Sequence, residues 1–140
     1  MLKKNVYVSF DEKDRKYYEK IVSWNGNPYL GFNFIEAPAG DFSSSFFVKI
    51  KNNIMSKLAQ SSVTLVIVGE CANDASPDCL EIGALNWQSF EIVKSLARGN
   101  SLVAVKTDAD LAAPVAMRGA SVIWAQSLTL DAVMSALAKA

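Results

Sequence analysis

Short apolar segments alternate with longer amphipathic segments along the whole chain. Runs rich in valine, isoleucine and phenylalanine have the length and composition of β-strands. Five such runs cover residues 5–10, 31–36, 62–69, 101–106 and 120–125. Four intervening segments have helical composition and cover residues 11–25, 44–60, 87–98 and 128–139. The pattern therefore predicts a chain in which strands and helices alternate.

Turn and cap residues refine the predicted helices. The third helix is expected to end at Gly99, because helices commonly stop on a glycine in the left-handed conformation. Residues 70–86 are the least regular part of the chain. Ser76 and Pro77 can begin a short additional helix there, with serine as the cap and proline in the first turn.

Alternating strands and helices predict the fold class. Right-handed crossovers between successive strands give a parallel sheet with helices on both faces. Residues 63–68 are almost entirely apolar, as expected of a central strand covered on both sides. The sequence therefore predicts one α/β domain over residues 1–140. The expected architecture is a flavodoxin-like three-layer sandwich with a five-stranded parallel sheet of order 2-1-3-4-5.

Ligands of such a sheet bind at the carboxyl ends of the first and third strands, so the loops after Phe10 and Gly69 are the candidate site. The first loop reads "SFDEKD". Its acidic side chains fit capping of the next helix and disfavour a phosphate-binding loop. A phosphoacceptor receiver domain would need an aspartate closing strand three and a lysine closing strand five. This chain has Glu70 and Trp124 there, which excludes that class.

Composition excludes several further classes of protein. Basic and acidic residues number 14 each, so no net positive charge favours nucleic acid. No apolar run has the length of a membrane span, which predicts a cytoplasmic protein. Cys71 and Cys79 match neither a zinc nor a redox motif and are expected to be free thiols. Histidine is absent, so no metal site is expected and any catalysis must use other groups.

Glu91 is the one carboxylate of the third predicted helix, within the run "NWQSFEIVKSLARGN". The helical period predicts a buried apolar stripe made of Phe90, Val93, Leu96 and Ala97. Glu91 falls off this stripe, so composition alone favours an exposed glutamate paired with Lys94. Its replacement by alanine is then expected to change stability by no more than ~0.5 kcal/mol.

Three segments of the chain resemble one known family. They read "VYVSFDEKDR", "VIVGE" and "WQSFEIVKSLARGNSLVAV". Together they resemble the TIR-like family typified by the TIR protein of the Thoeris anti-phage defence system, a small flavodoxin-like domain. The family is similar in having an aromatic, two further residues, a second aromatic and Glu-Ile at the head of the third helix. This chain has Trp87, Phe90, Glu91 and Ile92 in those places.

The resemblance implies a role for each matching residue. Glu91 matches the catalytic glutamate of TIR enzymes that cleave NAD⁺. Ser9, Phe10 and Asp11 match the stretch that lines the nucleotide pocket. Apart from the resemblance, Trp87 or Phe10 offers an aromatic ring that could stack on a base or ring of the substrate and exclude water.

Two regions depart from the family pattern. Residues 70–86 replace a short turn and contain Leu-Glu-Ile, which makes Glu81 a competing candidate for the catalytic carboxylate. Residues 34–47 match only loosely, in a region that often shapes the pocket entrance of TIR domains.

The resemblance also implies a function. The expected protein uses NAD⁺ as its substrate with no other cofactor, releases nicotinamide and forms ADP-ribose or a cyclic isomer. The cyclic product would signal to a separate effector in anti-phage defence, and self-association into a homo-oligomer is expected. The alternative is a non-enzymatic TIR-like module that binds a nucleotide or another protein.

Overall fold

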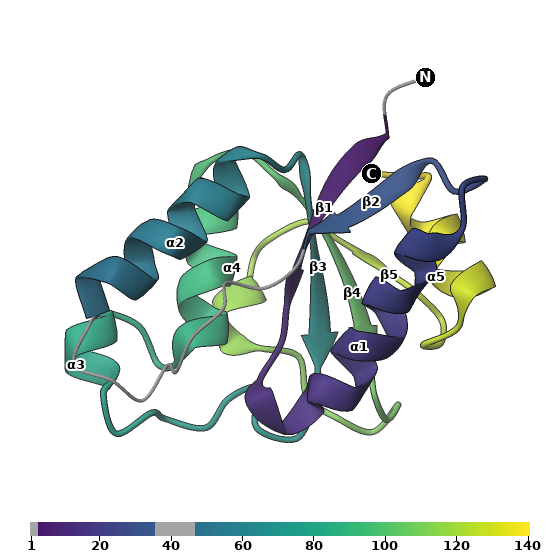
Figure 1. Cartoon of the computed structure of the whole chain (residues 1–140). Coiled ribbons are helices and arrows are strands. Elements are labelled where there is room, and N and C mark those ends of the chain that lie inside the picture. The colour runs from purple at the N-terminus through teal and green to yellow at the C-terminus, as the bar shows by residue number, and fades with distance from the viewer. Residues whose placement is uncertain (1–2, 36–46) are drawn as a thin grey trace.

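The computed structural model describes residues 3–35 and 47–140 and contains a five-stranded parallel sheet (Figure 1). The strands are β1 (Lys4–Ser9), β2 (Phe32–Ile35), β3 (Val63–Val68), β4 (Ser101–Lys106) and β5 (Val122–Trp124). Their order is β2-β1-β3-β4-β5, and every neighbouring pair is parallel. The predicted sheet order is therefore confirmed.

Helices occupy the predicted connections. The α-helices are α1 (Arg15–Ser23), α2 (Phe47–Ala59), α3 (Cys79–Ile82), α4 (Trp87–Ala97) and α5 (Leu130–Leu137). Short 3-10 helices are η1 (Glu12–Asp14), η2 (Trp24–Gly26) and η3 (Val115–Met117). The helix predicted over residues 11–25 is thus divided into η1, α1 and η2. The predicted start of the second helix at residue 44 lies outside the described residues.

Gly99 correctly predicted the end of a helix, whereas Ser76 did not mark the first residue of the extra helix. Gly99 has a φ of 79° directly beyond α4, which confirms the predicted stop. The extra helix predicted after Ser76 exists as α3, but it begins at Cys79. Ser76 Oγ instead accepts a hydrogen bond from the Asp78 backbone N at 3.1 Å, in the turn before the helix.

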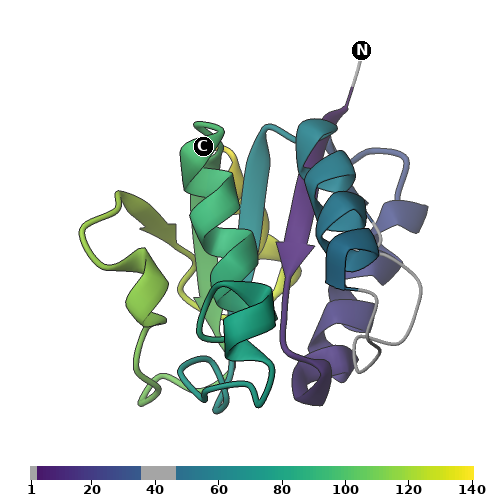
Figure 2. The same ribbon diagram turned by 90° about the vertical axis from the view of Figure 1, so that its left-hand side faces the viewer.

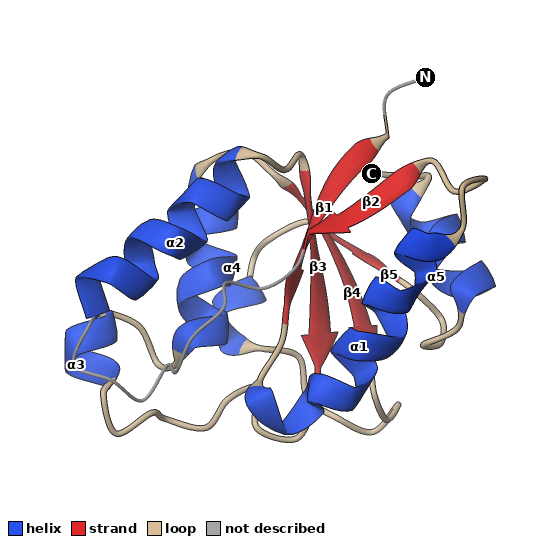
Figure 3. Ribbon diagram, in the orientation of Figure 1, coloured by secondary structure: helices blue, strands red, loops and turns tan. Residues whose placement is uncertain are grey.

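The helices form a layer on each face of the sheet (Figures 1 and 3). Helices α1 and α5 pack on one face, and α2 and α4 pack on the other. Figure 2 is viewed from the second side, with α2 and α4 in front of the strands. The predicted three-layer sandwich is confirmed. None of the described helices is both long enough and apolar enough to cross a membrane.

Alternation along β1 divides its side chains between the two layers. Val6 and Val8 belong to the core beneath α1 and α5, whereas Tyr7 belongs to the core beneath α2 and α4. Successive side chains of a strand point to opposite faces, so Ser9 has the same orientation as Tyr7. Two hydroxyl groups of β1 therefore point toward the side of the sheet that carries α4.

The buried face of α4 differs from the predicted stripe. Val93 and Leu96 are 48% and 38% exposed, and Ala97 is also exposed, so the stripe prediction is wrong at these positions. Only Phe90 is buried as predicted. The buried polar residues of the helix are Gln88, Ser89, Glu91 and Ser95. Hydrophobic periodicity cannot identify such a face, because its members are polar.

Ser95 illustrates how this polar face is satisfied. Its hydroxyl donates to the backbone oxygen of Glu91 at 2.7 Å and lies 2.8 Å from Thr64 Oγ1 on β3. All three residues are buried. Buried polar groups are stable when they are hydrogen-bonded, so this contact fastens α4 to the central strand.

Gly69, directly after β3, leaves room for a buried carboxylate. A Cβ placed on Gly69 would lie 1.8 Å from Asp14 Oδ2, and Asp14 is itself buried. We expect Gly69→Ala to lower the free energy of unfolding by about 1–3 kcal/mol, because overpacking must displace that carboxylate. Denaturant unfolding measures the change.

The matched control is the same substitution in an Asp14→Ala background, where the obstructing carboxylate is gone. We expect the cost of Gly69→Ala to shrink there to a small fraction of its value in the natural chain. An equal cost in both backgrounds would contradict the steric explanation.

Candidate functional site

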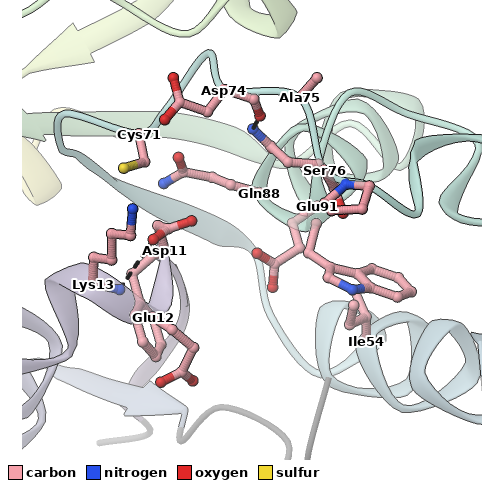
Figure 4. Close-up of a pocket in the computed structure, with 14 residues that line it drawn as sticks. Asp11, Glu12, Lys13, Ile54, Cys71, Asp74, Ala75, Ser76, Gln88 and Glu91 are labelled. Atoms are coloured by element: carbon pink, nitrogen blue, oxygen red, sulfur yellow. Dashed lines mark hydrogen bonds between the residues drawn. The ribbon is translucent and has the colours of Figure 1, made fainter. Parts of the chain in front are cut away.

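A pocket of about 370 Å³ lies beyond the carboxyl ends of β1 and β3, at the predicted ligand edge of the sheet. Its walls come from the residues after β1, the middle of α2, the segment after β3 and the first turns of α4. Figure 4 shows Asp11, Glu12 and Lys13 on one side of this pocket, with Gln88 and Glu91 projecting from α4.

Glu91 lies in the pocket wall with only 8% of its surface exposed. Its Oε2 accepts a hydrogen bond from the Tyr7 hydroxyl, and its Oε1 accepts one from Ser9 Oγ at 2.9 Å. The exposed glutamate paired with Lys94 is therefore a wrong prediction. Lys94 Nζ instead lies 5.4 Å from the ring centroid of Phe90.

Burial dominates the electrostatics of this carboxyl group. It raises the pKa of Glu91 from 4.5 to about 8, while the hydrogen bonds from Tyr7 and Ser9 act in the opposite direction. Burial and the charge of Glu91 raise the pKa of Tyr7 well above its usual value, so its hydroxyl remains a donor. A positive charge placed in the pocket would favour the ionised form of Glu91.

We expect Tyr7→Phe to raise the pKa of Glu91 further above 8, because it removes a hydrogen bond donated to the carboxylate. A ¹³C NMR titration of the glutamate carboxyl groups measures this pKa without any assay of function. Tyr17→Phe is the matched control, since the Tyr17 ring packs beside Lys16 and the α1 core. An unchanged Glu91 titration in Tyr7→Phe would contradict the assigned role of Tyr7.

Asn86 fixes the start of α4 and joins it to the segment after β3. Its Oδ1 accepts from the Ser89 backbone N at 2.8 Å, which caps the helix. Its Nδ2 donates to the carbonyl oxygens of Ala72 and Asp74 at 3.0 and 2.9 Å. One side chain thus holds two walls of the pocket together.

The predicted residues of the first loop occupy different positions. Ser9 is fully buried behind Glu91 and supports it, whereas Phe10 and Asp11 line the pocket. The Phe10 ring stacks on Tyr18 with centroids 4.2 Å apart. Asp11 also accepts from the Lys13 backbone N at 3.0 Å, so it caps η1 while it faces the pocket.

Trp87 lines the pocket at the first turn of α4. Its ring centroid lies 6.3 Å from that of Phe47 and 5.6 Å from that of Phe90. The indole therefore packs in an aromatic cluster with Phe47 and Phe90 and also borders the pocket that Glu91 lines.

The competing carboxylate is far less suited to chemistry. Glu81 is exposed on α3 and does not line the pocket, and its backbone oxygen accepts from Lys51 Nζ at 2.7 Å.

Cys71 lines the pocket and Cys79 does not, and both are free thiols. Among the described residues, no cluster of three or more histidine, cysteine, aspartate or glutamate side chains could hold a metal ion.

Sequence reasoning missed Tyr7, Gln88 and Asn86. The alternation of β1 contains a signal for Tyr7, because a hydroxyl-bearing aromatic stands between two valines two positions before Ser9. Gln88 lies three residues before Glu91, a spacing that places both on one helix face. No local signal identifies Asn86, since its partners belong to another segment.

Comparisons with known proteins place the fold. A deoxyribosyltransferase from Bacillus psychrosaccharolyticus is similar with a TM-score of 0.52 and 16% identity, covering 78% of this chain and 77% of that one. A deoxyribosyltransferase from Leishmania mexicana is similar with a TM-score of 0.60 and 14% identity, covering 97% of each chain. A prokaryotic SEFIR domain is similar with a TM-score of 0.55 and 9% identity, covering 97% of this chain and 94% of that one.

Family membership rests on the sequence itself. No curated protein matches this chain significantly. The family described as Thoeris protein ThsB, TIR-like domain, matches residues 7–111, which is more than half of the 140 residues. The matched part includes Tyr7, Ser9 and Glu91, together with all the described residues that line the pocket. This chain therefore belongs to the TIR-like domain family of Thoeris protein ThsB.

Proposed function

We propose that this protein cleaves the bond between nicotinamide and ribose in NAD⁺, with Glu91 as the catalytic carboxylate. The observation that carries the proposal is the buried carboxyl group of Glu91, held by the hydroxyls of Tyr7 and Ser9, in the wall of the pocket at the ligand edge of the sheet. Membership of the Thoeris family supports a role in anti-phage defence.

One carboxylate is sufficient for this reaction. Ordinary glycoside hydrolysis uses two carboxyl groups, because one must protonate the leaving alkoxide. The nicotinamide ring of NAD⁺ carries a positive charge and leaves as a neutral molecule, so no general acid is required. The ionised carboxylate stabilises the positive charge that develops on the ribose carbon.

Substrate binding would also prepare Glu91 for the reaction. With its pKa near 8, the carboxyl group is mostly protonated at neutral pH in the empty pocket. The positively charged nicotinamide ring favours the ionised form, so binding of NAD⁺ would release the proton. Tyr7 and Ser9 remain as donors to the carboxylate and hold it in place.

Other pocket residues suit the remaining parts of a dinucleotide. Trp87 and Phe10 provide aromatic surfaces on which a ring can stack. Lys13 is the only cationic side chain among the described residues that line the pocket, and it would lie near the diphosphate. Asp11 would face a ribose hydroxyl, which donates hydrogen bonds readily to a carboxylate.

The fate of the ribosyl group determines the biological output. Attack by water gives ADP-ribose, whereas attack by a nitrogen or hydroxyl of the same nucleotide gives a cyclic isomer. We propose that the product is a messenger read by a separate effector, that the protein acts in the cytoplasm, and that it self-associates into a homo-oligomer. Two of the structurally similar proteins are named as deoxyribosyltransferases, and transfer of a sugar group is the same general type of reaction as the one proposed.

The test is incubation of the concentrated protein with NAD⁺, with a crowding agent to promote assembly, followed by chromatography with mass detection. Release of nicotinamide supports the proposal, and the mass of the second product distinguishes hydrolysis from cyclisation. Absence of release at high protein concentration, together with NAD⁺ binding in calorimetry, would instead indicate a nucleotide-binding module.

A further inference from the structure

Gln88 is a second polar side chain on the buried face of α4. It lines the same pocket as Glu91 and is 3% exposed. The two residues are three positions apart on one helix, so their side chains leave the helix about 5–6 Å from each other. In Figure 4 the Gln88 side chain points toward the side of the pocket on which Cys71 lies.

The orientation of the Gln88 amide is determined by two backbone carbonyls. Its Nε2 donates to the Ser9 oxygen at 3.2 Å and to the Ile67 oxygen at 2.7 Å, at the ends of β1 and β3. A carbonyl oxygen can only accept, so the reversed amide would place three acceptors together. The amide is therefore held with its nitrogen toward the strands.

Oε1 of the same amide has no hydrogen-bond partner among the described residues, although it is buried. Native proteins leave few such atoms unpaired, because an unsatisfied buried acceptor costs free energy. Here the unpaired atom belongs to a residue of the pocket wall beside the candidate catalytic carboxylate. A ligand that supplies an N–H donor would satisfy it.

We propose that Gln88 determines specificity for nicotinamide by accepting a hydrogen bond from its carboxamide N–H at Oε1. The inference rests on the proposed function, which places Glu91 beside the ribose carbon that carries the ring. The carboxamide projects from that ring and holds its only N–H donors. A group one helical turn from Glu91 is well placed to meet it, while the ribose hydroxyls remain with Glu91.

A dinucleotide that lacks this donor tests the proposal. In 3-acetylpyridine adenine dinucleotide the amide nitrogen is replaced by a methyl group, while the ring keeps its positive charge. We expect the natural protein to prefer NAD⁺, measured as the ratio of kcat/KM for the two dinucleotides. In Gln88→Met we expect that ratio to fall by about tenfold or more, because a site built for a hydrogen bond then loses its acceptor.

Ser95→Ala is the matched control, since it also removes buried hydrogen bonds of α4 but does not line the pocket. It is expected to leave the ratio unchanged, whatever its effect on the two rates. Product inhibition of the natural protein needs no variant. In the natural protein, free nicotinamide is expected to inhibit NAD⁺ cleavage at about a tenfold lower concentration than free 3-acetylpyridine.

The outcomes separate the two proposals. Release of nicotinamide with an unchanged ratio in Gln88→Met, or equal inhibition by the two free bases, overturns the role of Gln88 and leaves the proposed function standing. Failure of the natural protein to release either base overturns the proposed function and the role of Gln88 with it.

Discussion

Replacement of Glu91 by glutamine is expected to lower the rate of nicotinamide release from NAD⁺ by about a thousandfold or more. Glutamine has nearly the same shape, and its carbonyl oxygen can accept a hydrogen bond from one of the two hydroxyls of Tyr7 and Ser9. Its amide NH2 group can donate to the oxygen of the other hydroxyl, so both contacts are kept. What the variant lacks is the negative charge that stabilises the developing positive charge on the ribose carbon. Nicotinamide is quantified by chromatography at saturating NAD⁺.

Glu81→Gln is the matched control for this experiment. The substitution is chemically identical, but Glu81 is exposed on α3 and does not line the pocket. We expect its rate to equal that of the natural protein. Activity retained in Glu91→Gln and lost in Glu81→Gln would reverse the assignment, and activity retained in both would exclude either carboxylate as the catalytic group.

The second large effect expected is on pH dependence. Because the free carboxyl group has a pKa of about 8, kcat/KM should rise about tenfold per pH unit below pH 8 and level off above it. The positively charged substrate lowers this pKa in the complex, so the profile of kcat is expected to bend at a lower pH. A kcat/KM independent of pH between 6 and 8 would contradict ionised Glu91 as the active form.

The same pKa predicts how stability changes with pH. The folded state binds the proton of Glu91 more tightly than the unfolded state, whose carboxyl group has a pKa near 4.5. Stability associated with Glu91 is therefore fully present below about pH 4.5 and is lost as the pH rises to about 8. At pH 7 the loss is about 3 kcal/mol. Denaturant unfolding of Glu91→Gln, which lacks the ionisable group, should show a correspondingly weaker decline over this range.

The stability expectation drawn from sequence alone does not hold for this residue. A surface glutamate off the core stripe can be replaced at a cost of about 0.5 kcal/mol or less. Glu91 is buried and bonded to two hydroxyls, so Glu91→Ala would leave both donors without their acceptor. Glutamine is the informative substitution for this reason.

Local sequence determined the architecture of this protein. Runs of apolar residues, turn residues such as Gly99 and the alternation of elements predicted the strand order, because these signals depend on neighbouring residues and on general rules of chain connection. The same rules placed Phe10 and Asp11 at the ligand edge, since the carboxyl ends of parallel strands meet there.

The site itself was only partly accessible from the sequence. Resemblance to a family identified Glu91, whereas periodicity assigned it to the solvent side of α4. Periodicity failed because it counts apolar residues, and the buried face of this helix is largely polar. Of residues 34–47, which match the family loosely, residues 36–46 lie outside the described part of the chain.

Only the tertiary structure decided the chemical environment of the carboxylate. Tyr7 and Ser9 precede Glu91 by 84 and 82 positions, and they meet it only when α4 packs on β1. Gln88 likewise finds its partners on β1 and β3. Burial and hydrogen bonding between distant segments set the pKa of Glu91 and leave one acceptor of Gln88 unpaired. Sequence determined which elements form and in what order. Packing determined which polar groups share the pocket, because that depends on contacts that no local pattern encodes.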